Sequence, residues 1–96
     1  MITLITPEEA KKLLNDKKNI NILDVRTPKE FENGHLENAN NLNFYDANFP
    51  ERIEELPHDK KYLIYCHSVG RAFRTGELME ELGFREIIVV KGEIVK

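Results

Sequence analysis

With 96 residues, a net charge of −3 and one cysteine, the sequence is long enough for one small domain and lacks the excess of basic residues that would attract nucleic acid or an anionic membrane. The single cysteine excludes an internal disulfide and a cysteine-built zinc site, and it fits a reducing compartment. The sequence has neither a secretory signal pattern nor an apolar run of about 20 residues, so we expect one cytoplasmic domain over residues 1–96.

Two apolar segments in the first half of the chain are each followed by a helix start. Residues 2–5 and 20–25 are predicted strands, and the second has apolar side chains on both faces, as in a strand covered by helices on two sides. Each helix start combines a threonine cap, a proline at the first helical position and a glutamate that completes a capping box. These starts are Thr6-Pro7-Glu8-Glu9 and Thr27-Pro28-Lys29-Glu30. The first helix is predicted to end near Asn15, and the second, short helix at Gly34.

The second half of the chain continues the alternation of strands and helices. Its predicted elements are a weak strand at 40–43, a brief helix from about Pro50 to 56, a strand at 61–66, a helix from about Arg71 to 82 and a strand at 86–91. Such alternation predicts an α/β domain with a mainly parallel sheet and right-handed crossovers. Ligands bind at the carboxyl ends of strands in such sheets, and Asp24, Arg26 and Cys66 are at such ends.

The segment YLIYCHSVGR at residues 62–71 carries the candidate site, because an apolar strand runs directly into Cys66. The thiolate is the reactive form of cysteine. A curled loop formed by His67, Ser68, Val69, Gly70 and Arg71 would direct successive backbone N–H groups and a helix N-terminus at the sulfur and favour the anion. Gly70 is expected to supply a left-handed conformation, and Arg71 a permanent positive charge. We therefore predict Cys66 as nucleophile and residues 67–71 as an anion-binding loop.

Several readings stay open from these residues alone. A lone cysteine after an apolar strand is often a small buried hydrophobe. The same cradle would hold the outer sulfur of a persulfide or a bound oxyanion, so persulfide chemistry and phosphate or arsenate chemistry are both allowed. Asp24 and Arg26 are predicted to support the site as an ion pair or cap rather than to react, and His67 either assists the thiolate or faces solvent. Three scattered histidines predict no metal site, and we expect no cofactor.

Four segments together resemble the single-domain rhodanese family, in the right order over nearly the whole chain. They are Asp24-Val25-Arg26, Glu30-Phe31 with Gly34-His35-Leu36 and Ala39, the loop from Cys66 to Arg71, and Leu82-Gly83-Phe84 followed by Lys91-Gly92. The resemblance implies a small three-layer domain with a five-stranded sheet flanked by helices. It also implies a thiosulfate-type sulfurtransferase, in which Cys66 takes sulfur from an anionic donor and passes it to cyanide, a thiol or a protein acceptor. Arg71 and the loop amides would then receive the donor.

Loop length and two departures bear on the alternatives. Four residues separate Cys66 from Arg71, as in sulfurtransferases, whereas related phosphatases use a loop one residue longer. Active members often have glycine where this chain has Val69, and they commonly continue past the position of Gly92 into a final helix. The shorter loop favours sulfur transfer over the first alternative, a small phosphatase or arsenate reductase. The two departures are the argument for the second alternative, a non-catalytic interaction module on the same scaffold.

Overall fold

The computed structural model describes residues 1–16 and 19–95. Strands and helices alternate along the described chain, as the sequence predicted. In chain order they are β1 (Ile2–Ile5), α1 (Pro7–Asn15), β2 (Ile20–Asp24), α2 (Pro28–Glu32), β3 (Ala39–Asn41), α3 (Phe49–Glu54), β4 (Lys61–Tyr65), α4 (Val69–Glu81) and β5 (Glu86–Val90).

The strands form one five-stranded sheet in the order β1-β5-β4-β2-β3. Every pair is parallel, and Asp24 at the end of β2 is level with Tyr65 at the end of β4 and with Asn41 at the end of β3. The predicted α/β fold with a parallel sheet is therefore confirmed. Because all carboxyl ends lie at one edge, the residues that follow β2 and β4 meet there.

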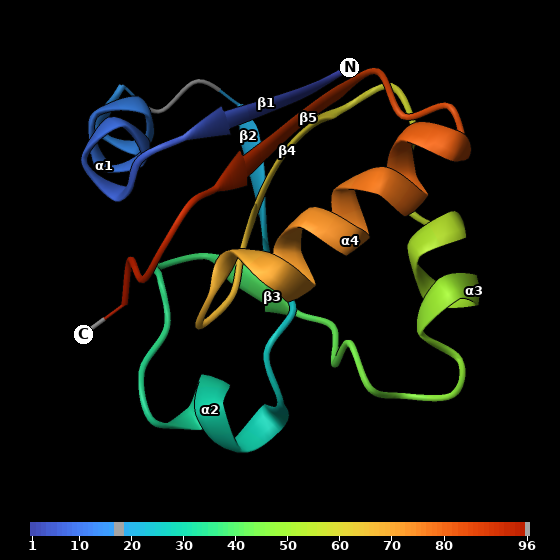
Figure 1. The fold of residues 1–96 in the computed structure, drawn as a ribbon, viewed down its shortest axis with the longest axis horizontal. Helices are drawn as coiled ribbons and strands as arrows, with labels where there is room; N and C mark the ends of the chain where they lie inside the picture. The colour runs from blue at the N-terminus through green and yellow to red at the C-terminus, as the bar shows by residue number, and fades with distance from the viewer. Residues whose placement is uncertain (17–18, 96) are drawn as a thin grey trace.

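Helices cover the sheet on both faces, which gives three layers (Figure 1). Helices α3 and α4 lie on one face, α1 lies on the other, and α2 lies beyond the carboxyl ends of the strands. Side chains of β4 alternate between two apolar clusters: Ile64 and the following Cys66 belong to the cluster beneath α4, whereas Leu63 and Tyr65 belong to the cluster beneath α1. Adjacent residues of this strand thus serve opposite faces of the sheet.

The helix starts are partly as predicted. Both capping boxes are present, since Thr6 and Thr27 each accept from the amide three residues on and the glutamates there accept from the threonine amides. Helix α4, however, begins at Val69, two residues before the predicted start at Arg71. Ser68 is extended, with φ −130° and ψ 175°, so the chain turns directly from β4 into the helix. Strand β3 is also one residue earlier and shorter than predicted.

Helix α4 approaches the sheet closely at Gly76. A Cβ atom there would lie 3.0 Å from Cγ2 of Val89 and 3.4 Å from Cγ2 of Ile87, both buried residues of β5. Glycine therefore sets the distance between helix and sheet, and with it the position of the first turn of α4 above the end of β4.

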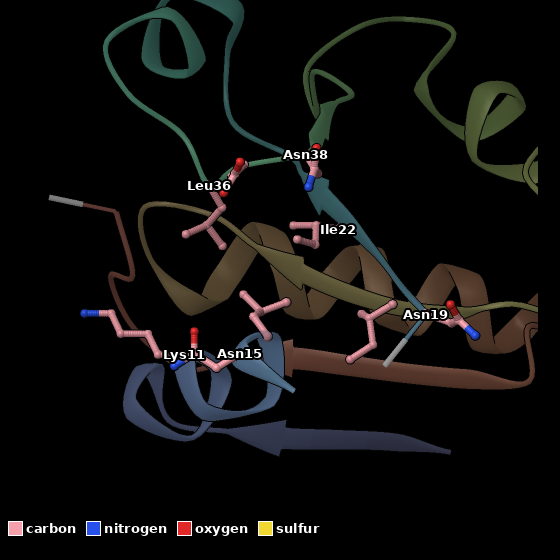
Figure 2. Close-up of a pocket in the computed structure, with 9 residues that line it drawn as sticks. Lys11, Asn15, Asn19, Ile22, Leu36 and Asn38 are labelled. Carbon is pink, nitrogen blue, oxygen red and sulfur yellow. The ribbon is translucent and has the colours of Figure 1, made fainter. Parts of the chain in front are cut away.

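A pocket of about 670 Å³ opens on the α1 face (Figure 2). It is lined by Lys11, Leu14, Asn15, Asn19, Ile20, Ile22, Leu36, Glu37 and Asn38. This pocket is on the face of the sheet opposite the Cys66 side chain and includes no residue of the 66–71 loop, so it is not the predicted site. Among the helices described, none is long and apolar enough to cross a membrane.

Candidate active site

Cys66 lies directly after β4, at the carboxyl edge of the sheet and beneath the first turn of α4. The residue is 1% exposed, and its side chain belongs to the apolar cluster on the α4 face. The four residues that follow it, 67–70, are all exposed. The sulfur is thus covered in this conformation by a loop that is itself open to solvent.

The sulfur is hydrogen-bonded by the start of α4. The backbone amide of Ala72 donates to Sγ of Cys66 at 3.3 Å, and the thiol contacts the carbonyl oxygen of Ser68. In α1, α2 and α3 the equivalent fourth helical amide donates to the carbonyl of the N-cap residue at 2.9 to 3.0 Å. In α4 the sulfur takes the place of that carbonyl as acceptor. The sulfur therefore lies at the N-terminus of a helix, which carries a partial positive charge.

Four exposed residues, His67, Ser68, Val69 and Gly70, connect Cys66 to the body of α4. Nδ1 of exposed His67 lies 2.9 Å from a carboxylate oxygen of Glu93. Ser68 is at the N-cap position, but its side chain makes no capping hydrogen bond. Val69 is 40% exposed in the first turn of α4. Gly70 lies in the same turn with helical backbone, because the chain enters α4 two residues early, so the predicted left-handed conformation is wrong.

Arg71 is held by an acidic residue from α2. Its Nη1 and Nη2 atoms donate to Oε1 and Oε2 of Glu30 at 3.0 and 3.3 Å. The guanidinium also lies over the ring of Tyr45, with its central carbon 5.5 Å from the ring centroid. The hydrogen bond from Arg71 lowers the pKa of Glu30 to about 2, and the same contact raises the pKa of Arg71. The pair is therefore ionised on both sides at any ordinary pH.

Asp24 and Arg26 form a buried, bidentate ion pair next to the site. Nη2 of Arg26 donates to Oδ2 of Asp24 at 2.7 Å, and Nε donates at 3.0 and 3.1 Å to the two oxygens. The hydroxyl of Tyr65 donates to Oδ2 at 2.7 Å. The pKa of Arg26 is raised by its hydrogen bonds to Asp24, and burial raises the pKa of Tyr65, with the hydrogen bond to Asp24 as the next cause.

This buried group fixes the connector between α2 and β3. Arg26 donates to the carbonyl of Gly34 at 2.6 Å, and the amide of Leu36 donates to the hydroxyl of Tyr65 at 3.0 Å. Since Asp24 and Tyr65 project to the α1 face, they lie on the side of the sheet opposite Cys66. Their contacts therefore hold α2, and with it Glu30, in place at the carboxyl edge.

Sequence reasoning missed three residues that shape the site. Glu30 was predicted as a capping residue and as part of the segment that resembles the family, but not as the partner of Arg71, which is 41 positions away. The amide of Ala72 was placed inside the helix and not at the sulfur, and Tyr65 was read as a strand residue. One feature of the sequence could have indicated Glu30. The second Thr-Pro-x-Glu segment directly follows a predicted strand, so its glutamate carboxylate is expected near the carboxyl edge of the sheet. Within residues 1–16 and 19–95, no three His, Cys, Asp or Glu side chains could together hold a metal ion.

Comparison with known proteins points to one family. A family model described as Rhodanese-like domain matches residues 6–96. A sulfurtransferase from Allochromatium vinosum is 27% identical over 95 residues, which are 99% of this chain and 87% of that protein. A crystal structure from Staphylococcus saprophyticus superposes with a TM-score of 0.83 at 26% identity, covering 96% of this chain and 89% of that one.

Some relatives are much longer than this chain. A tRNA uridine(34) hydroxylase from Cytophaga hutchinsonii is 34% identical over 90 residues, which are 88% of this chain and 28% of the hydroxylase. The chain thus corresponds to little more than a quarter of that protein, and the name hydroxylase describes the longer protein.

Proposed function

Because this chain belongs to the family of rhodanese-like domains, we propose that it is a sulfurtransferase that carries sulfur as a persulfide on Cys66. The observation that carries the proposal is the hydrogen bond from the Ala72 amide to Sγ, where the sulfur replaces a backbone acceptor at the start of α4. A charge-assisted hydrogen bond from an amide and the partial charge of the helix both favour a sulfur anion over a neutral thiol. The persulfide formed from that anion carries its charge on the added sulfur.

In the first step, the Cys66 thiolate attacks the outer sulfur of a sulfane-sulfur donor such as thiosulfate. A bond forms between Sγ and that sulfur, and the sulfur–sulfur bond of the donor breaks. Sulfite leaves with the bonding electron pair, and the persulfide anion remains on Cys66. Residues 67–70 are exposed, and in this proposal their backbone amides hold the anionic donor during the attack.

In the second step, a thiophilic acceptor removes the added sulfur. Cyanide, a thiolate or a cysteine of a protein acceptor attacks the outer sulfur, the persulfide bond breaks, and its electron pair returns to Cys66 as thiolate. For cyanide the product is thiocyanate. The second step restores the starting enzyme, so no external oxidant or reductant is needed.

Access to the sulfur requires a local rearrangement, because Cys66 is 1% exposed. Either rotation of its side chain or a shift of residues 67–70 uncovers Sγ. Both movements break the contact of the thiol with the Ser68 carbonyl.

Intact-mass analysis tests the proposal. Wild-type protein incubated with thiosulfate or with glutathione persulfide should gain one sulfur atom and lose it on adding cyanide. Because Cys66 is the only cysteine of the chain, Cys66→Ser should gain none. A wild-type protein that gains no sulfur from either donor would refute the proposal.

Two observations favour a second candidate, a non-catalytic interaction module. The 1% exposure of Cys66 and the neutralised Arg71 also suit a structural role for both residues. In that case Cys66→Ser would change the stability of the fold, and neither donor would modify the wild-type protein. The phosphatase alternative is less suited to the geometry, because the carboxylate of Glu30 already neutralises Arg71 and would repel a phosphate. Hydrolysis of an aryl phosphate without sulfur transfer would favour it.

A further inference from the structure

Arg71 is neutralised within the folded chain. Its side chain is 16% exposed, and both terminal nitrogens donate to the carboxylate of Glu30, which is itself 33% exposed. The ring of Tyr45 covers the guanidinium from another direction. Because two of the five guanidinium N–H groups are used in this pair, an anion that approaches Arg71 also meets the ionised carboxylate of Glu30 and is repelled by it.

The start of α2 holds Glu30 in the position where it pairs with Arg71. Its Oε1 atom accepts from the amide of Thr27 at 2.9 Å and lies 3.1 Å from the Thr27 hydroxyl, in addition to the bond from Arg71. The capping box of α2 therefore holds the carboxylate in one orientation. If Arg71 were displaced, Glu30 could turn to solvent only by breaking its capping hydrogen bonds with Thr27.

The other basic side chain of the loop is also paired. His67 lies 2.9 Å from the carboxylate of Glu93 in the segment that follows β5. Within the loop from Cys66 to Arg71, each basic side chain thus has a carboxylate partner. The one permanent cation of this loop, Arg71, is therefore neutralised by Glu30, so a second negative charge on a donor that approaches Cys66 gains little attraction.

We infer that Glu30 is a specificity-determining residue of the proposed transfer: by holding Arg71, it directs the site to donors with at most one negative charge, such as persulfides and thiosulfonates, and disfavours the doubly charged thiosulfate ion. This inference rests on the proposed function and narrows its donor class. With a persulfide donor, the Cys66 thiolate attacks the outer sulfur, a new sulfur–sulfur bond forms, the donor bond breaks, and the donor thiolate leaves with the electron pair. The proton of the outer sulfur stays with it.

Glu30→Gln is the informative variant. Glutamine is compatible with the capping box, so α2 should persist, while the carboxylate charge that neutralises Arg71 is removed. Glu32→Gln is the matched control, because it removes the same charge from an exposed position of the same helix. A double variant with Glu30→Gln and Arg71→Ala tests whether any effect of the first substitution acts through the guanidinium.

Alkylation of Cys66 measures the charge at the sulfur without any sulfur transfer. Iodoacetate is an anion and iodoacetamide is neutral, and changes in thiolate content cancel in the ratio of their rates. With one cysteine in the chain, intact mass reports the reaction directly. Glu30→Gln should raise the iodoacetate-to-iodoacetamide ratio about fivefold, while Glu32→Gln and the double variant should stay within about twofold of wild type.

Donor selectivity supplies the second measurement. Thiosulfate and methanethiosulfonate differ by one charge, and Glu30→Gln should raise the ratio of their kcat/KM values in favour of thiosulfate by about fivefold. An alkylation ratio that is unchanged in Glu30→Gln, or changed equally in Glu32→Gln, overturns the inference. If the alkylation ratio shifts but wild type takes sulfur from no donor, the proposed function fails while control of the charge stands. If neither reagent reaches Cys66 in the folded protein, both are overturned.

Discussion

The hydroxyl of Tyr65 donates to Oδ2 of Asp24 at 2.7 Å, and this bond joins the ends of the two central strands β4 and β2 beneath the candidate site. The same hydroxyl accepts from the amide of Leu36. Tyr65 directly precedes Cys66 but faces the opposite side of the sheet. Cys66 is therefore positioned by its neighbour Tyr65, whose contacts also fix the α2–β3 connector.

Tyr65→Phe should lower the free energy of unfolding by about 1–3 kcal/mol, because it leaves the half-buried amide of Leu36 without its acceptor and removes one donor to the buried Asp24. Urea denaturation monitored by far-UV circular dichroism gives the change. Tyr45→Phe is the control, since Tyr45 is 66% exposed and loss of a solvated hydroxyl should change stability by less than about 0.5 kcal/mol. Equal effects of the two substitutions would mean that the hydrogen bonds of the Tyr65 hydroxyl contribute nothing to the free energy of unfolding.

Asp24→Asn should be more damaging, with a loss of about 3–5 kcal/mol, because Arg26 is 8% exposed and would keep its charge without a full counter-charge. The measurement is the midpoint and slope of urea unfolding. Asp46→Asn removes an acid from an exposed pair with Arg52, 3.7 Å apart, and should cost less than about 1 kcal/mol. If Asp24→Asn were as mild as Asp46→Asn, the buried pair would not brace the carboxyl edge.

Local patterns predicted most of the fold. The apolar runs at residues 20–24 and 86–90 identified strands buried on both faces, and the two Thr-Pro-x-Glu segments identified helix starts with their capping boxes. Each of these signals depends on residues within four positions of one another. Parallel order followed from the alternation of strands and helices, which leaves few other topologies.

The site was predicted less completely because its contacts join distant residues. Arg71 with Glu30 and Tyr65 with Asp24 are both pairs separated by 41 positions. The loop around Cys66 was expected to curl through a left-handed Gly70, but an extended Ser68 turns the chain into α4 earlier. Serine is a common N-cap residue with extended backbone, but nothing local in the sequence indicates that Glu30, and not a ligand, is the partner of Arg71.

Gly76→Ala should destabilise the fold although alanine is the better helix former. Its Cβ would lie 3.0 Å from Cγ2 of Val89, which is fully buried and has little room to move. The cost of overpacking, about 1–3 kcal/mol, should exceed the gain in helix propensity of about 1 kcal/mol. Gly70→Ala is the control, because its Cβ would meet only Oγ of Ser68 at 3.9 Å, and thermal unfolding should show no loss of stability there. A more stable Gly76→Ala would contradict close packing of α4 on β5.

The ion pair between Glu30 and Arg71 should make stability depend on pH in the acid range. Hydrogen bonding by Arg71 lowers the pKa of Glu30 in the folded chain from 4.5 to about 2. Because the folded pKa lies below the unfolded one, the stabilisation is complete above about pH 4.5 and is lost as the pH falls towards 2. With one third of the Glu30 side chain exposed, solvent screening limits the contribution to about 1 kcal/mol.

The difference in unfolding free energy between wild type and Glu30→Gln isolates this contribution. It should be about 1 kcal/mol at pH 7, shrink below about pH 4.5 and be nearly absent at pH 2, as measured by urea denaturation at each pH. Glu32→Gln, which removes an exposed charge from the same helix, should give a difference near zero at pH 7. A wild-type advantage over Glu30→Gln that stays constant down to pH 2 would mean that shape and capping, rather than the ionised carboxylate, hold Arg71 in place.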